Sequence, residues 1–208
     1  TEALLTFVRL FRLPHTWGIM ALAFVTYGSF IALRGLWMGP LMADRHGWPL
    51  VQTGNLVVAV TLVALASLPL FGRADPGARR RRYLMSACTL LSALLFLLPA
   101  LGLGSRADVV AMLVFAAISG YSTLQYPDVK DAYEPSVIGR AFALFTMAVF
   151  MGVAVVQWLT GLVASAALAQ GLDPFGPVFG CIAALLVLGA LGFMALPQPP
   201  ALRRGRND

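Results

Sequence analysis

The chain has 208 residues, of which 59% are hydrophobic and only 12% are charged. A soluble domain carries about 25% charged residues, so this composition excludes an ordinary soluble globule and indicates an integral membrane protein. The net charge of +6 comes from short basic blocks between apolar runs, a distribution that argues against a nucleic-acid partner.

The apolar runs predict an all-α polytopic membrane protein. Each run is long enough to cross a ~30 Å hydrocarbon core as a helix. In chain order the six predicted spans are Trp17–Ala43, Leu50–Phe71, Tyr83–Leu103, Val109–Tyr126, Arg140–Ala169 and Phe175–Leu196. Residues 17–196 would thus form one six-helix bundle. Residues 1–16 predict a short amphipathic segment on the membrane surface that ends at Pro14, and residues 197–208 predict a basic cytoplasmic tail.

The first span is the most informative because it contains Arg34. An arginine at membrane depth costs about 2.5–3.5 kcal/mol on insertion scales, so it normally faces a partner, a bundle interior or water. Its planar guanidinium stays charged and pairs well with carboxylate or phosphate. We predict that Arg34 anchors an anionic solute; a structural ion pair, or extension of the side chain to the outer headgroups, is the alternative.

The fourth span is rich in small and polar residues, and like the first it has a proline near its C-terminal end (Pro127 and Pro40). These two spans occupy equivalent places in two triplets of helices. The sequence therefore predicts a 3+3 inverted-repeat bundle, the arrangement in which secondary transporters bind solute near the membrane midplane. The third and sixth spans carry few strongly polar groups, and we expect them to face lipid.

Basic residues predict how the bundle is oriented. Those on the side of the termini are Arg9, Arg12, Arg73, Arg79, Arg80, Arg81, Arg82, Lys130, Arg140, Arg203, Arg204 and Arg206. Only Arg45 and Arg106 fall on the other side. The positive-inside rule thus predicts that both termini lie in the cytoplasm and that the protein resides in the inner (plasma) membrane.

Three stretches resemble the C-terminal half, helices seven to twelve, of a major facilitator superfamily transporter. The loop from Gly72 through Asp75 and Gly77 to Arg79 and Arg80 is similar to the family's cytoplasmic G-x-x-x-D-R-x-G-R-R signature, with one residue fewer and with Pro76 after the aspartate. The run Ala-Leu-Arg-Gly-Leu-Trp-Met-Gly-Pro that ends at Pro40 is similar to the family's A-L-Q-G-L-W-x-G-P run of helix seven. The segment from Gly139 to Gly161 is similar to helix eleven.

The resemblance implies two six-helix bundles that rock around a central cavity. This chain supplies one bundle, so the second would be the N-terminal half of a longer protein or another copy of the chain. The first and fourth spans would line the cavity. The resemblance also implies a gating role for the cytoplasmic loop residues Gly72, Asp75, Gly77, Arg79 and Arg80; the alternative for the basic block is an orientation signal that attracts anionic lipid.

The predicted cavity-lining residues lie on three spans. They are Arg34, Tyr27, Phe30 and Trp37 on the first, Tyr121, Ser122, Gln125 and Tyr126 on the fourth, and Gln157 on the fifth. For the aromatic residues and the small polar ones, ordinary packing between helices is an equal alternative. For Gln157 a structural hydrogen bond to a neighbouring helix is favoured over contact with the solute.

The leading functional prediction is one bundle of a secondary active transporter that moves a small polar or anionic solute by alternating access. The alternative is a six-helix membrane module that dimerises without transporting. We predict no catalytic role: both histidines fall at span ends, and Ser119 to Ser122 do not form the G-x-S-x-G elbow of a serine hydrolase. We also predict no cofactor and no metal site, since Cys88 and Cys181 both lie within spans.

Overall fold

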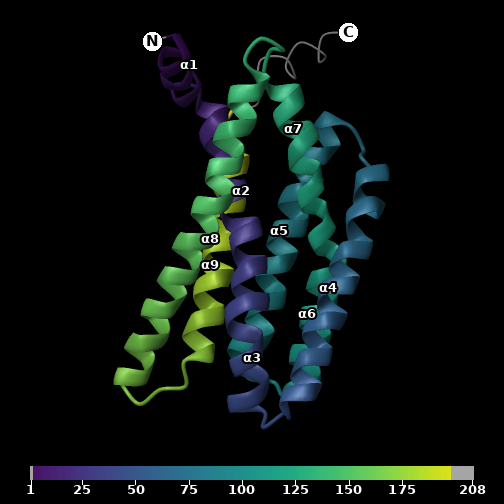
Figure 1. Ribbon diagram of the computed structural model, residues 1–208, viewed down its shortest axis with the longest axis vertical. Coiled ribbons are helices and arrows are strands. Elements are labelled where there is room, and N and C mark those ends of the chain that lie inside the picture. The colour runs from purple at the N-terminus through teal and green to yellow at the C-terminus, as the bar shows by residue number, and fades with distance from the viewer. Residues whose placement is uncertain (1, 198–208) are drawn as a thin grey trace.

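The computed structural model describes residues 2–197, with side chains from residue 7 onward. Within that range every regular element is a helix, and six helical segments are long and apolar enough to cross a membrane. The segments run side by side with their long axes roughly parallel (Figure 1). An all-α membrane protein with six spans is therefore confirmed, and of the predicted tail at residues 197–208 only Pro197 lies inside the described range.

The first span is interrupted by two π-helical turns. A surface helix, α1 (Glu2–Phe11), precedes it, and Pro14 begins α2 (Pro14–Ala32). Proline suits a first helical turn because its missing N–H would have no partner there. The span continues through the π turn η1 (Leu33–Trp37), α3 (Met38–Pro40) and a second π turn, η2 (Leu41–Arg45).

The second and third spans are the uninterrupted helices α4 (Leu50–Arg73) and α5 (Ala78–Leu101). The fourth consists of α6 (Ser105–Ser119), the 3₁₀ segment η3 (Gly120–Leu124) and α7 (Gln125–Ala132). The fifth and sixth are α8 (Ile138–Ala169) and α9 (Phe175–Ala195).

Two predicted boundaries were wrong, for different reasons. The third span begins at Ala78, so Arg79 to Arg82 form the first turns of α5 and not a loop; arginine is a good helix former, and hydropathy alone misplaces such a start. The fourth span continues past Tyr126 to Ala132 because Pro127 falls in the first turn of α7, where proline is tolerated.

The first helix of each triplet packs mainly against the second and third helices of the other triplet. The first span packs against the fifth and sixth (α2 with α8 and α9), and the fourth packs against the second and third (α6 with α4 and α5). The third and sixth spans, α5 and α9, pack against each other. These contacts have the symmetry of a repeat that relates spans one and four, two and five, and three and six, but the packing of α8 against α9 has no counterpart of similar extent between α4 and α5.

The first and fifth spans approach closely at a pair of glycines. Gly28 of α2 and Gly152 of α8 lie at the crossing, and a Cβ added to Gly28 would come within 2.8 Å of the Gly152 carbonyl oxygen. Small residues let helix backbones meet in membranes, where dispersion contacts and not hydrophobic exclusion hold helices together.

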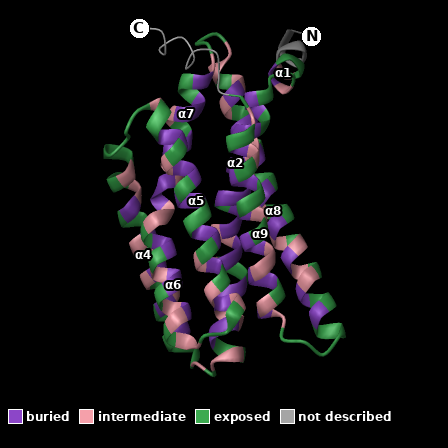
Figure 2. Cartoon of the chain, turned by 180° about the vertical axis from the view of Figure 1, so that it is seen from behind, coloured by how far each residue is buried: buried purple, intermediate pink, exposed green. Residues whose placement is uncertain are grey.

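The burial of the spans differs from the prediction made from their polarity. Of the residues in an apolar 18-residue stretch of each helix, 22% are buried in α4 and 28% in α8, against 44% in both α5 and α9. The third and sixth spans do carry exposed leucines, but they are more enclosed than the second and fifth (Figure 2). One reason is a buried hydroxyl stripe on α5, formed by Ser86, Thr89 and Ser92, which hydropathy averages conceal.

Candidate functional site

A cavity of about 250 Å³ opens between the first, second and fourth spans. Its walls come from α2 and η1, from α4, and from α6 and η3. A second cavity, of about 310 Å³, lies between α2, α4, the 125–126 region and α8. The two share the lining residues Thr26, Tyr27, Leu68 and Ser122 and therefore lie next to each other; together we call them the groove.

Arg34 lies half-buried in the wall of the first cavity. Its Nη1 donates a hydrogen bond to Thr61 Oγ1 over 3.3 Å, and its guanidinium carbon lies 5.8 Å from the centre of the Phe30 ring. No carboxylate among the described side chains pairs with it. Among the described side chains, this cation is thus held by one hydroxyl and one aromatic face.

Of the spans that line the groove, the first and the fourth depart from α-helical geometry beside it. Arg34 lies in the π turn η1, where the Met38 N–H bonds to the Leu33 carbonyl five residues earlier. Tyr121 and Ser122 lie in the 3₁₀ segment η3. π turns within α-helices are frequent at functional sites, and broken helices in membranes are tolerated where they border protein or a cavity.

The 3₁₀ segment is fixed in place by contacts with its neighbours. A Cβ at Gly120 would come within 2.5 Å of the Ser67 backbone of α4, so the two helices touch directly here. The buried Tyr121 hydroxyl accepts a hydrogen bond of 2.9 Å from Thr89 of α5. Ser122 is therefore presented to the groove from a rigid support.

Seven of the nine predicted lining residues lie in the groove. Tyr27, Phe30, Arg34, Tyr121 and Ser122 line the first cavity, and Gln125 and Tyr126 line the second, together with Tyr27 and Ser122. The Gln125 amide also links the two central spans, because its Nε2 donates to Thr26 Oγ1 over 2.9 Å.

Trp37 and Gln157 line neither cavity. Trp37 is buried toward α8 and α9: its Nε1 donates to Thr160 Oγ1 over 3.0 Å, and its ring meets Phe175 edge-on. The prediction assumed α-helical spacing from Arg34, but the π turn holds more residues per turn and rotates Trp37 away. The Gln157 side chain is half-buried on α8 outside both cavities.

Sequence reasoning missed Thr26 and Thr61, the hydroxyl partners of Gln125 and Arg34. Thr61 lies in an apolar run that shows no other sign of a site, whereas Thr26 is the neighbour of the predicted residue Tyr27. A threonine in such a run bonds its own backbone, as Thr61 does with the Val57 carbonyl at 2.7 Å, so its presence alone signals nothing.

The end of the bundle that carries α1 and the 74–77 loop, which we call the basic end, contains an ion-pair network. Asp75 accepts two hydrogen bonds from Arg81, of 2.9 and 2.7 Å, and Arg81 also donates to Asp131 over 2.8 Å. The pairing with Arg81 lowers the pKa of the Asp75 carboxyl. Gly77, at φ +83°, donates its N–H to Asp75 and begins α5.

The network thus includes Asp75 and Gly77 of the predicted gating set but not its arginines. Arg79 and Arg80 are exposed on α5. Arg81 and Arg82 are buried, and Arg82 donates to the Phe193 and Leu196 carbonyls at the end of α9. A Cβ at Gly72 would meet no atom within 4 Å, so no packing constraint acts on that glycine.

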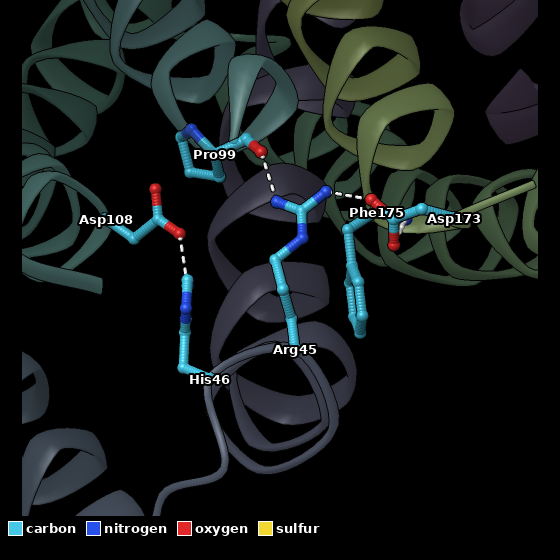
Figure 3. Close-up of polar contacts among 6 residues, drawn as sticks. All are labelled: Arg45, His46, Pro99, Asp108, Asp173 and Phe175. Atoms are coloured by element: carbon cyan, nitrogen blue, oxygen red, sulfur yellow. Dashed lines mark hydrogen bonds and ion pairs between the residues drawn. The ribbon is translucent and has the colours of Figure 1, made fainter. Parts of the chain in front are cut away.

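The opposite end of the bundle has its own polar contacts (Figure 3). Arg45 pairs with Asp173, donates to the Pro99 carbonyl over 2.6 Å and lies over the Phe175 ring. His46 Nε2 lies 2.7 Å from an oxygen of the fully buried Asp108. These contacts join the end of the first span to the third, fourth and sixth spans.

No family model matches this chain, and comparisons with curated proteins and with solved structures returned no significant similarity. Within residues 2–197 no three His, Cys, Asp or Glu side chains are grouped so as to hold a metal ion. The groove and its single cation, Arg34, are therefore the features of the described residues that point to a function.

Proposed function

We propose that the chain is one six-helix bundle of a secondary active transporter that moves a small polar or anionic solute by alternating access. The observation that carries the proposal is Arg34, a half-buried cation without a carboxylate partner among the described side chains, in a groove between the first and fourth spans. A charge at this depth is retained where it has a function, and transporters of inverted-repeat design bind solute at interrupted helices near the midplane.

The proposal requires a second bundle to close the groove, either the N-terminal half of a major facilitator-type protein or another copy of the chain. The exposed apolar faces of α4 and α8 flank the groove and are available for that contact. From the excess of basic residues at the basic end, we propose that this end faces the cytoplasm and that the protein resides in the plasma membrane.

Replacing Arg34 by alanine in the two-bundle assembly is expected to reduce solute uptake at least about tenfold, because a hydrogen bond to a charged group contributes about 1.5–3 kcal/mol. Arg34→Lys should retain part of the uptake, since it keeps the charge without the planar fork. Uptake into cells or proteoliposomes measures the effect, with Arg106→Ala, an exposed arginine outside the groove, as the control.

Unchanged uptake kinetics in Arg34→Ala would remove the anion-anchor role. Absence of flux under any imposed gradient, for the chain alone and paired with its second bundle, would instead favour a module that assembles without transporting.

A further inference from the structure

The groove contains a single charge. Among the described residues that line its two cavities, Arg34 is the only ionisable side chain other than the tyrosines. In a medium of low polarity an unpaired charge is costly, so a bound molecule is favoured when it brings one negative charge. A second negative charge on the solute would remain uncompensated, and a positive charge would be repelled.

The walls next to Arg34 are apolar and aromatic. Phe30 and Phe115 lie 6.1 Å apart between ring centres, and Leu65 and Leu68 of α4 line the same cavity. Such a wall takes up the hydrocarbon or ring portion of a ligand, while a few polar groups fix its orientation.

Polar groups without a hydrogen-bond partner lie away from Arg34, where the two cavities meet and in the second cavity. The residues Tyr27, Ser122 and Tyr126 line the groove, and the hydroxyl of each has no hydrogen-bond partner among the described residues; Tyr27 and Tyr126 are partly exposed. Behind them the buried Gln125 Oε1 is also without a partner. Tyr27 precedes Arg34 by seven residues, which is roughly 10 Å along the helix axis.

We propose that the groove is a site for amphipathic monoanions: molecules with one carboxylate or similar anionic group at Arg34, an apolar or aromatic body along the Phe30 wall, and an uncharged hydrogen-bonding group at the far end near Tyr27, Ser122 and Tyr126. This inference rests on the proposed function and narrows its solute class. It follows from one cation, an apolar wall and a set of free hydroxyls arranged in that order along the groove.

The test is a panel of four probes of one shape against the purified full chain, in detergent or nanodiscs. The monoanion is 3-(4-hydroxyphenyl)propionate. Its methyl ester lacks the charge, 3-(4-carboxyphenyl)propionate carries a second negative charge, and 3-(4-hydroxyphenyl)propylamine carries a positive one. Binding is measured as the concentration-dependent rise of the thermal unfolding temperature.

The monoanion is expected to bind at least about tenfold more tightly than each of the other three, a difference of about 1.4 kcal/mol. Arg34→Gln should abolish that preference for the monoanion, whereas Arg106→Gln should leave it intact. Ser122→Ala and Tyr27→Phe should weaken binding of the monoanion and, to a similar extent, of its methyl ester, because both carry the phenol hydroxyl that these side chains would contact. The unfolding temperature of each variant without probe establishes that it is folded.

Equal or tighter binding of the dianion, the amine or the ester would overturn the inference, as would the absence of any shift with the monoanion. These outcomes are distinct from failure of the proposed function, which is decided by the uptake measurement on Arg34→Ala. A transporter whose uptake depends on Arg34 but which prefers a dianion would contradict only the solute class.

Discussion

Replacing Gly152 by alanine is expected to prevent the first and fifth spans from packing together. The added Cβ would overlap the Phe24 carbonyl group of α2, with its carbonyl carbon only 2.7 Å away. The obstacle is backbone, so no side chain can rotate out of the way and the helices must separate. Overpacking a core costs about 1–3 kcal/mol where side chains adjust, and we expect the loss here to exceed that range.

The matched control is Gly161→Ala, nine residues further along the same helix. A Cβ at Gly161 would meet no atom within 4 Å, so this change should alter stability by about 1 kcal/mol or less. Thermal unfolding with size-exclusion chromatography measures both variants. Equal stability of the two would show that α2 and α8 do not cross at Gly28 and Gly152.

Replacing Arg81 by alanine is expected to destabilise the basic end by about 1–2 kcal/mol, because it removes the charge-assisted hydrogen bonds of a buried guanidinium to two partly exposed carboxylates. Arg81 is 4% exposed and holds both Asp75, in the loop between the second and third spans, and Asp131, at the end of the fourth. The partial exposure of the two carboxylates places the expected loss below the largest values known for such pairs.

Arg79→Ala and Arg80→Ala provide controls of the same chemistry on the same helix. Both arginines are exposed, so each change should cost less than about 1 kcal/mol. Thermal unfolding of the three variants, and limited proteolysis of the 74–77 loop, measure the effect. A loss in Arg79→Ala or Arg80→Ala as large as that in Arg81→Ala would contradict the pairing.

The number and order of the spans could be predicted from the sequence, because every backbone polar group in a bilayer must be satisfied within a helix and hydropathy reports where that happens. The segment Leu50–Phe71, for example, differs from α4 by only two residues at one end. Helix starts within basic runs could not be predicted this way. Hydropathy assigns Arg79 to Arg82 to water, although their backbone is helical and two of the side chains are buried.

Most of the groove could be predicted from polar residues in otherwise apolar spans. Arg34, Ser122 and Gln125 were found in this way, and they do line it. The direction in which Trp37 faces could not be predicted, because no pattern in the local sequence indicates a π turn. The choice of Arg81 over Arg79 as the partner of Asp75 depends on how α5 rotates as it leaves Gly77, which tertiary packing decides.

How deeply each span is buried could not be predicted from the sequence either. Lipid tails and leucine side chains are equally apolar, so an apolar helix surface suits either environment. The polar content of α5 and α9 therefore indicated nothing reliable about their position. In the structure α5 and α9 pack against each other, and α5 carries the buried hydroxyl stripe.

The central claim is that the first and fourth spans border an aqueous pathway, and cysteine accessibility tests it most directly. In a chain whose Cys88 and Cys181 are replaced by alanine, Ser122→Cys is compared with Leu94→Cys and Leu191→Cys, which lie on the exposed apolar faces of α5 and α9. A membrane-impermeant thiol reagent applied to membranes is expected to label only the Ser122→Cys chain, and a saturating anion that binds at Arg34 should slow the reaction. Labelling of Ser122→Cys no faster than that of the two leucine positions would contradict the account.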